Sequence, residues 1–252
     1  MQYKTITVQE TGHIATILIN RPKANNILTE QVINELHHSL SEINLNDNIW
    51  VTILSAIGDK FCYGTEIKPD AIQVNLKNFR IADTIAAMSK PIIAGINGDA
   101  IDQGLELTLA CDIRIVAKKA ILGLTQVKNK GIPWDGGTQR LPRIIGRSWS
   151  NYLILTSSLI DSKQALDIGL VNEIVPAAKV FSRCHELASQ MSKYGPIAAA
   201  YAKEAILKGY QTTLQDGFRL EADLNFLLQS TKDRAEGIHS FLENRPPKYR
   251  GE

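Results

Sequence analysis

The 252-residue sequence has few cysteines, no long apolar run and no excess of charge of either sign. Its three cysteines are odd in number and show no paired spacing, which argues against a disulfide framework and favours a cytoplasmic protein. No apolar run approaches the roughly 18 residues needed to cross a bilayer, and the first residues lack a signal-peptide pattern. The 28 basic and 26 acidic residues nearly balance, so nucleic acid and acidic membrane surfaces are not expected partners.

The sequence also lacks the motifs of several common enzyme classes. It has no G-x-x-x-x-G-K-[ST] phosphate loop and no G-x-G-x-x-G turn after a predicted strand, which argues against a nucleotide-dependent enzyme. No serine lies in a G-x-S-x-G nucleophile elbow. The five histidines show no metal-ligand spacing with cysteines or carboxylates, so no bound metal is expected.

What the sequence does contain is a large apolar fraction, 44% of its residues, arranged in strand and helix patterns. Polar and apolar side chains alternate over residues 3–10, and β-branched residues are frequent in 14–20, so a hairpin around Gly12 is expected. Thr29 is placed to cap a helix whose apolar stripe extends to about Ile43. Further strands are expected at residues 50–56, 91–95 and 113–117, and helices at 79–88 and 105–110. This alternation predicts an α/β fold with crossover connections.

After Pro142 the pattern becomes mainly helical. Helices are expected at residues 147–156, 162–167, 180–193, 196–208, 214–228 and 232–243. A polar tail follows at residues 244–252. The sequence therefore predicts a first part rich in strands and helices and a last third made of helices.

Two glycine-containing turns, at residues 61–68 and 97–106, each follow a predicted strand and precede a predicted helix. Backbone N–H groups at such a turn, together with the helix dipole, stabilise negative charge. Two turns facing one another would hold one developing oxyanion. Turns of this kind also serve as plain connections, so the pattern alone leaves both interpretations open.

Six sequence motifs occur in an order that points to a known family. They lie at residues 20–26 (NRPKANN), 61–68 (FCYGTEIK), 90–98 (KPIIAGING), 110–112 (ACD), 136–142 (GGTQRLP) and 165–176 (ALDIGLVNEIVP), followed by the predicted helix with Glu204. Together they resemble the crotonase superfamily of enoyl-CoA hydratases and isomerases over nearly the whole chain. The resemblance implies an α/β fold with a crotonase-type ββα spiral core at residues 1–195 and a helical C-terminal trimerisation region at residues 196–252.

The resemblance also implies a substrate and an assembly. The substrate would be an acyl-CoA, or an acyl group held on an acyl carrier protein. Coenzyme A would be part of the substrate, and no cofactor would be bound permanently. The helical C-terminal region would form a homotrimer or a dimer of trimers.

Carried over residue by residue, the resemblance implies that the backbone N–H groups of Thr65 and Gln103 form a thioester oxyanion hole. The second position is usually glycine in the family, within a run of glycines, whereas this chain has Asp102-Gln103-Gly104 there. Without the resemblance, Lys68 would be interpreted as a solvated surface lysine. With it, four residues would contact coenzyme A: Lys23 and Ala24 at the adenine end, and Ile67 and Lys68 near the pantetheine and phosphates.

The acid–base groups are expected to decide the reaction. By the resemblance, Glu106 is the catalytic carboxylate, whereas from the pattern alone it also fits an acid in the first turn of a helix. The second carboxylate of the family is replaced by Gln126, which can form hydrogen bonds but cannot exchange a proton usefully. Asp135 is a candidate substitute, because some relatives carry a working aspartate in this loop, one residue earlier by our count, at Trp134. The alternative is that Asp135 caps a turn.

Hydration or dehydration of an enoyl thioester is the leading prediction. Double-bond isomerisation, which needs only one shuttling base, is the alternative, followed by decarboxylation or C–C hydrolysis. Tyr63 and Trp134 are candidates to line the acyl pocket, and Trp134 fits core packing equally well. A catalytically weak acyl-CoA-binding paralogue is the hypothesis from a different class, since Gln126 lacks a carboxylate and Gln103 replaces a glycine.

Overall fold

The N-terminal segment forms an antiparallel hairpin at the edge of the larger of two sheets. In the computed structural model, which describes residues 3–66 and 76–252, strand β1 (Ile6–Thr11) pairs with β2 (Ile14–Ile19). Gly12 turns the chain with a φ of 57°, a conformation that glycine adopts without a steric penalty. The predicted hairpin is therefore confirmed.

The larger sheet has the strand order β1-β2-β3-β5-β7-β10, and neighbours are parallel from β2 onward. Its remaining strands are β3 (Val51–Ala56), β5 (Ile92–Ile96), β7 (Ile113–Ala117) and β10 (Glu173–Val175). All residues of β3 and β5 are buried, as expected for parallel strands covered on both faces. The predicted strands at 50–56, 91–95 and 113–117 correspond to β3, β5 and β7.

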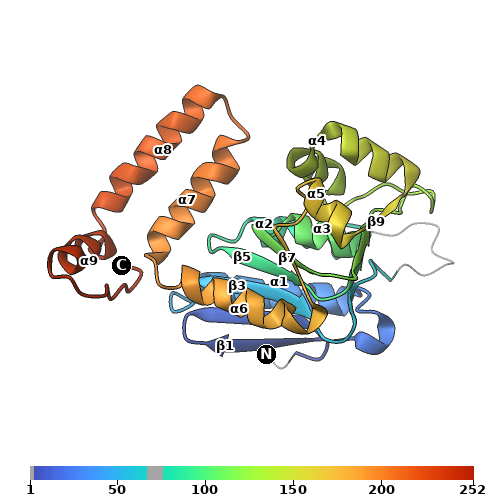
Figure 1. Cartoon of the computed structure of the whole chain (residues 1–252), viewed down its shortest axis with the longest axis horizontal. Coiled ribbons are helices and arrows are strands. Elements are labelled where there is room, and N and C mark those ends of the chain that lie inside the picture. The colour runs from blue at the N-terminus through green and yellow to red at the C-terminus, as the bar shows by residue number, and fades with distance from the viewer. Residues whose placement is uncertain (1–2, 67–75) are drawn as a thin grey trace.

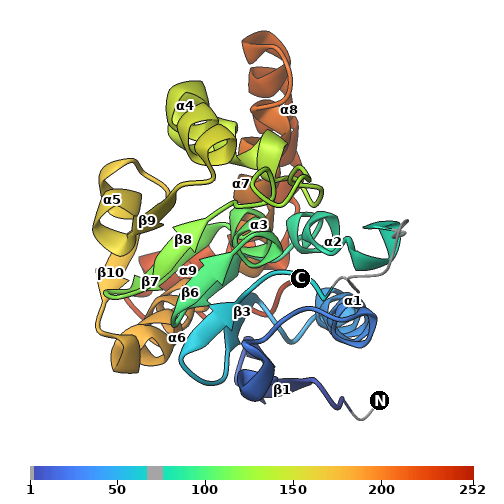
Figure 2. The same cartoon turned by 90° about the vertical axis from the view of Figure 1, so that its right-hand side faces the viewer.

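The smaller sheet has the order β4-β6-β8-β9, with β9 antiparallel to β8 and the others parallel. Its strands are β4 (Lys60–Cys62), β6 (Asp99–Ile101), β8 (Ile121–Gly123) and β9 (Leu159–Asp161). Strands β4, β6 and β8 each follow a strand of the larger sheet and precede a helix, so the chain repeats a strand–strand–helix unit (Figure 2). The carboxyl ends of β4 and β6 therefore lie side by side.

The helices of the core cover the sheets (Figure 1). Helix α1 (Glu30–Leu45) begins after Thr29, whose side chain accepts a hydrogen bond from the Val32 N–H, as predicted. The other helices are α2 (Ala82–Ala86), α3 (Gln103–Leu109), α4 (Gly137–Thr156), α5 (Ser162–Asp167) and α6 (Val180–Met191), with 3-10 turns η1 (Pro22–Ala24), η2 (Leu76–Phe79) and η3 (Ala177–Lys179).

Helix α4 begins earlier than the helix predicted at residues 147–156. It contains Pro142, which lacks an N–H and usually marks a helix boundary, so the sequence pattern placed the start too late. Gly146 has φ 77° and ψ 160°, which divides α4 into two helical segments. The predicted helix corresponds to the second segment, and the first was missed.

The C-terminal helices extend away from the sheets as an arm (Figure 1). They are α7 (Pro196–Gly209), α8 (Leu214–Gln229) and α9 (Lys232–Leu242), with α7 packed on α8. Their bounds agree with the predicted helices to within a residue. Several large apolar side chains on the arm are exposed in the single chain: Ile206, Tyr210, Leu214, Phe218, Phe226, Phe241 and Leu242.

Candidate active site

Two turns of the chain meet at the carboxyl ends of β4 and β6. Gly64, with a φ of 88°, follows β4, and Asp102 connects β6 to α3. A Cβ atom placed on Gly64 would lie 3.2 Å from Asp102 Cβ and 3.8 Å from the backbone nitrogen of Gln103. The two glycine-containing turns that the sequence singles out are therefore in contact.

Each of these turns carries a backbone N–H that is free to bind an external oxygen. The Leu28 N–H donates to Gly64 O at 2.8 Å, and the Glu66 N–H donates to Leu28 O at 2.9 Å. Alternate N–H groups of an extended segment point in opposite directions, so the Thr65 N–H points away from Leu28. Gln103 is the first residue of α3, where an N–H has no acceptor within the helix. Within residues 3–66 and 76–252, neither N–H donates a hydrogen bond.

Glu106 is the buried carboxylate of the site, on the first turn of α3. Its Oε1 accepts hydrogen bonds from the backbone N–H groups of Asp135 (2.9 Å) and Gly137 (2.7 Å), and its Oε2 accepts one from Gln126 Nε2 (3.1 Å). Burial raises the pKa of Glu106 to about 7, although the backbone donors favour the ionised form. A carboxylate with this pKa exchanges protons readily near neutral pH.

Gln126 lies directly against Glu106. Gln126 is 4% exposed, and its amide nitrogen donates a hydrogen bond to Glu106. Its Oε1 is buried and has no hydrogen-bond partner among the described residues. Buried polar atoms are almost always paired, so this oxygen is an unsatisfied acceptor beside Glu106.

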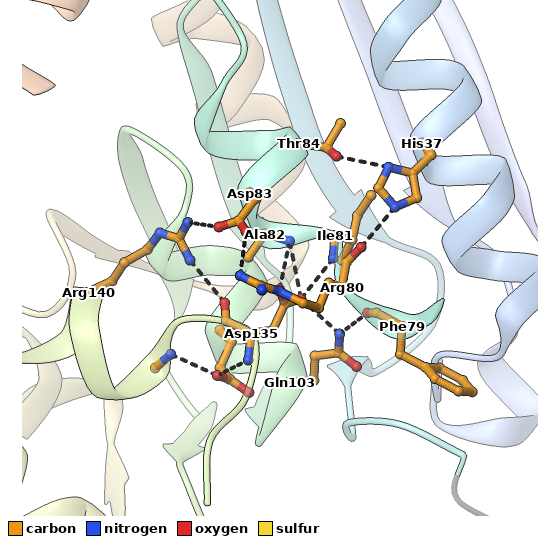
Figure 3. A network of polar contacts seen from close by, with 12 residues as sticks. His37, Phe79, Arg80, Ile81, Ala82, Asp83, Thr84, Gln103, Asp135 and Arg140 are labelled. Carbon is orange, nitrogen blue, oxygen red and sulfur yellow. Dashed lines mark hydrogen bonds and ion pairs between the residues drawn. The ribbon is translucent and has the colours of Figure 1, made fainter. Parts of the chain in front are cut away.

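Asp135 is held in the framework of the site (Figure 3). Its carboxylate accepts hydrogen bonds from the backbone N–H groups of Ile81 (3.0 Å) and Ala82 (3.1 and 3.2 Å) and from Gln103 Nε2 (2.8 Å). Burial raises the pKa of Asp135, whereas the donors around it favour its ionised form. The side chain thus satisfies the first N–H groups of α2 from a distant loop.

The two residues predicted to line the acyl pocket, Tyr63 and Trp134, lie in different surroundings. The Tyr63 hydroxyl donates to Asp99 Oδ2 at 2.7 Å, and Lys60 Nζ lies 2.6 Å from the same oxygen. Asp99 is the first residue of β6, whereas Gln103 follows the last residue of this strand. The Tyr63 hydroxyl therefore points away from the two turns that carry Thr65 and Gln103, called the paired turns below. Trp134 is half-buried beside the Glu106-binding loop, and its Nε1 is buried without an acceptor among the described residues.

The predicted coenzyme-contacting loop adjoins the first turn. Lys23 is exposed and Ala24 half-buried, and both lie in η1. The next residue, Asn25, accepts a hydrogen bond from the Tyr63 N–H at 3.2 Å, which connects this loop to the turn that carries Thr65. The other two predicted contacts, Ile67 and Lys68, lie outside the described residues.

Asp102 is a site residue that the sequence argument did not assign. It has φ 53° and ψ −123°, a conformation that is rarely adopted by residues other than glycine. Its carboxylate accepts from the Thr125 hydroxyl at 3.0 and 3.1 Å, and burial raises its pKa. The only signal was that this position belongs to a run of glycines in the family, which tolerate such a φ. The conformational strain therefore falls on Asp102, while Gln103 is helical.

The described part of the chain contains neither a metal-binding cluster nor a membrane-spanning helix. No group of three or more His, Cys, Asp or Glu side chains there is arranged to hold a metal ion. In the same residues, no helix combines the length and apolar character needed to cross a membrane. The three cysteines are buried and unpaired, and burial raises the pKa of each thiol to about 12.

Comparison with known protein families shows to which family the chain belongs. Residues 9–252 match the family model described as enoyl-CoA hydratase/isomerase. The chain belongs to this family. The crotonase resemblance and the α/β spiral fold expected from the sequence are thereby confirmed.

Individual members of the enoyl-CoA hydratase/isomerase family resemble this chain over its full length. An enoyl-CoA hydratase from Bacillus anthracis, solved by crystallography, superimposes with a TM-score of 0.95 at 38% identity and covers 99% of this chain and 100% of its own. A crotonyl-CoA hydratase from Syntrophomonas wolfei is 32% identical, with 99% of both chains covered. A 2,3-dehydroadipyl-CoA hydratase from Escherichia coli is 31% identical, with 98% of both covered.

Proposed function

We propose that the protein catalyses the addition of water to the double bond of an enoyl-CoA thioester, and the reverse dehydration. Family membership supports an acyl-CoA substrate, and the hydratases among the relatives support this reaction. The observation that carries the proposal is the Glu106–Gln126 pair, because it combines a carboxylate of pKa about 7 with a buried, unpartnered amide oxygen.

The paired turns supply the electrostatic part of the reaction. The thioester oxygen would accept hydrogen bonds from the N–H groups of Thr65 and Gln103. As the water oxygen bonds to the β-carbon, electrons of the double bond move to the thioester oxygen and form an enolate. Donors aimed at a developing oxyanion in a site shielded from water are worth about 10²- to 10³-fold in rate each.

Glu106 supplies the proton transfers. A water molecule held between Gln126 Oε1 and Glu106 Oε2 would donate to both, since both are acceptors. Glu106 takes one proton from this water as the new C–O bond forms. It then returns the proton to the α-carbon as the enolate collapses, so one carboxylate serves both steps and Gln126 needs no charge.

Double-bond isomerisation is the second candidate, and the missing carboxylate at Gln126 favours it. Glu106 would remove a proton from the α-carbon and return it to the γ-carbon, with the enolate oxygen held as before. This reaction uses no water, and so the Gln126 amide oxygen would have no part in it. Decarboxylation and C–C hydrolysis in the same oxyanion hole are further alternatives, as is a paralogue that binds acyl-CoA with little turnover.

Replacing Gln126 by Ala separates these reactions. We expect the rate of crotonyl-CoA hydration to fall about 10- to 100-fold, because the water loses one of its two acceptors. Isomerisation of a β,γ-enoyl-CoA should change much less. Chromatography that separates the double-bond isomers, coupled to mass spectrometry, measures both reactions with the purified protein. Gln190→Ala on the exposed surface of α6 is the control. A hydration rate unchanged in Gln126→Ala, or a product with a shifted double bond and no added water from the unmodified protein, would favour the isomerase.

The arm formed by α7–α9 is proposed to assemble the protein as a homotrimer or a dimer of trimers. It is the region at residues 196–252 that we assign to trimerisation, after a spiral core at residues 1–195. Its exposed apolar side chains support this, because monomers rarely expose so many close together. A cytoplasmic location is likewise our proposal, supported by the small, odd number of cysteines.

Replacing Phe226 by Lys tests this assembly. Phe226 is 73% exposed in the single chain, so the monomer should tolerate the change while an apolar interface should not. Light scattering after size-exclusion chromatography should show a trimer or hexamer for the unmodified protein and smaller species for the variant. Gln229→Lys, on the exposed surface of the same helix, is the control. A monomeric unmodified protein would contradict the proposed assembly.

A further inference from the structure

The side chains of Gln103 and Asp135 are in contact and fully buried beside the paired turns. From these contacts we infer that Gln103 and Asp135 are coupled positioning residues, which fix the oxyanion hole and the catalytic carboxylate relative to one another. The inference deepens the proposed function and rests on it. It also assigns Asp135 a different role from a second acid–base group.

Gln103 links both halves of the oxyanion hole through its side chain. Its Oε1 accepts a hydrogen bond from the Thr65 hydroxyl, so the two residues that supply the backbone donors are joined directly. Its Nε2 donates to the Phe79 carbonyl and to Asp135 Oδ2. Both ends of the amide are therefore used, and the side chain has no freedom to rotate without breaking a buried hydrogen bond.

Asp135 connects Gln103 to the base Glu106, and Figure 3 shows the Gln103 side of this connection. Its own backbone N–H donates to Glu106 Oε1 at 2.9 Å, while its carboxylate receives the Gln103 amide. A single residue thus contacts both the proton-transfer group and the side chain that spans the oxyanion hole. A shift of the Asp135 loop would move Glu106 relative to the thioester oxygen, and small displacements of this kind are costly in catalysis.

The donors around Asp135 favour an ionised carboxylate that only accepts hydrogen bonds, whereas burial raises its pKa. The groups directed at it are N–H donors from Ile81, Ala82 and Gln103. An asparagine at this position would direct an NH2 group at other donors, and would lose hydrogen bonds that an ionised acceptor strengthens. These bonds occupy the carboxylate within the protein framework, which suits a fixed support better than a group that must exchange protons with a substrate.

The charge of Asp135 has an effect that a purely steric support would not have. Its negative charge and that of Asp102 each raise the pKa of Glu106, in addition to the larger effect of burial. Arg140, which donates to the Asp135 carbonyl and pairs with Asp83, is the cation on the far side of the loop. Removing the Asp135 charge should therefore lower the pKa that governs activity.

The decisive readout is the polarisation of a bound thioester carbonyl. The para-dimethylaminocinnamoyl thioester of coenzyme A is a push–pull chromophore, whose absorption moves to longer wavelength as its carbonyl is polarised. We expect this red shift with the unmodified protein, because two N–H groups would bind the oxygen. It reports on the oxyanion hole without any turnover, so it also distinguishes an intact hole from lost proton transfer.

Three variants test the coupling: Asp135→Asn, Gln103→Met and the double variant. Each single change should reduce the red shift and lower kcat for crotonyl-CoA about 10- to 100-fold, with KM changed much less. The double variant should lose less than the product of the two single losses, because the partners act on one another. Asp135→Asn should also move the acid limb of the kcat/KM profile to lower pH. Asp167→Asn, which removes an exposed carboxylate from α5, is the control and should change none of these.

Thr65→Val tests the same link if a buried variant fails to fold. It removes only the hydroxyl bonded to Gln103, keeps the backbone N–H, and suits an extended segment. Its red shift and kcat should fall in the same direction. Wild-type red shifts and kcat values in Thr65→Val and in any folded Asp135 or Gln103 variant would overturn the inference while leaving the proposed function intact. An unmodified protein that neither shifts the chromophore nor turns over enoyl-CoA would overturn both.

Discussion

Replacing Glu106 by Gln is expected to lower kcat for enoyl-CoA hydration by about 10⁴-fold, while substrate binding changes little. General acid–base groups contribute about 10²- to 10⁴-fold, and the upper end applies because Glu106 is assigned both proton transfers. Steady-state kinetics with crotonyl-CoA measures the loss. Glu42→Gln on the exposed face of α1 is the matched control. A Glu106 variant that keeps more than a tenth of the wild-type kcat would contradict the assignment.

The Glu106→Gln variant is expected to fold, so a loss of kcat reports the loss of proton transfer rather than unfolding. The new amide oxygen can still accept from the Asp135 and Gly137 N–H groups. The new NH2 group would meet Gln126, whose amide can turn so that its unpartnered Oε1 accepts the hydrogen bond. Thermal unfolding and binding of coenzyme A should therefore be close to those of the unmodified protein at low pH.

The raised pKa of Glu106 fixes the direction of two pH dependences. As a base, Glu106 is active when ionised, so kcat/KM should rise as pH increases through about 7. Its folded-state pKa lies above the unfolded value of 4.5, so its contribution to stability is complete below pH 4.5 and is lost as pH rises through about 7. That loss is about 3 kcal/mol. The unmodified protein should lose stability relative to Glu106→Gln over this window.

Replacing Gly104 by Ala is expected to lower both stability and activity. Alanine normally favours a helix over glycine by up to about 1 kcal/mol, so a loss here would reveal a specific contact. A Cβ on Gly104 would overlap the Cys62 carbonyl and lie 2.8 Å from Cys62 Cβ. Overpacking of this kind costs about 1 to 3 kcal/mol, and pushing α3 from β4 would separate the N–H groups of Thr65 and Gln103. We therefore expect a kcat about 100-fold lower.

Denaturant unfolding and crotonyl-CoA kinetics measure the two effects of Gly104→Ala. Gly131→Ala is the control, since its added Cβ would have ordinary contacts of 3.6 and 3.9 Å with Gln126 and the change lies in the loop beside the site. A Gly104 variant as stable and active as the control would show that the close contact of α3 with β4 is not needed for the oxyanion hole.

Much of the fold followed from periodicity and from capping. The hairpin before β3, the Thr29 cap of α1 and the three arm helices all have patterns long enough to be recognised. The three-residue strands of the smaller sheet were missed, because three residues show no periodicity and their pairing depends on the spiral. The start of α4 was missed because Pro142 is usually a boundary signal.

The site followed from the sequence only in part. Motif order pointed to Glu106, Gln126 and the two turns, and the structure places these side chains and turns together. The contacts of Asp135 could not be predicted, because its N–H donors come from residues 81 and 82 and from Gln103, far away in the chain. The strained backbone of Asp102 depends in the same way on the tertiary packing of Gly64 against it.

The most direct test of the central claim is the reaction of the purified protein with crotonyl-CoA in isotopically labelled water, followed by mass spectrometry. Hydration by the Glu106–Gln126 pair predicts a product that gains the mass of one water and carries one labelled oxygen. The rate of this reaction should fall strongly in Glu106→Gln. A bound thioester that gains no labelled oxygen, or a rate unchanged by Glu106→Gln, would contradict the account.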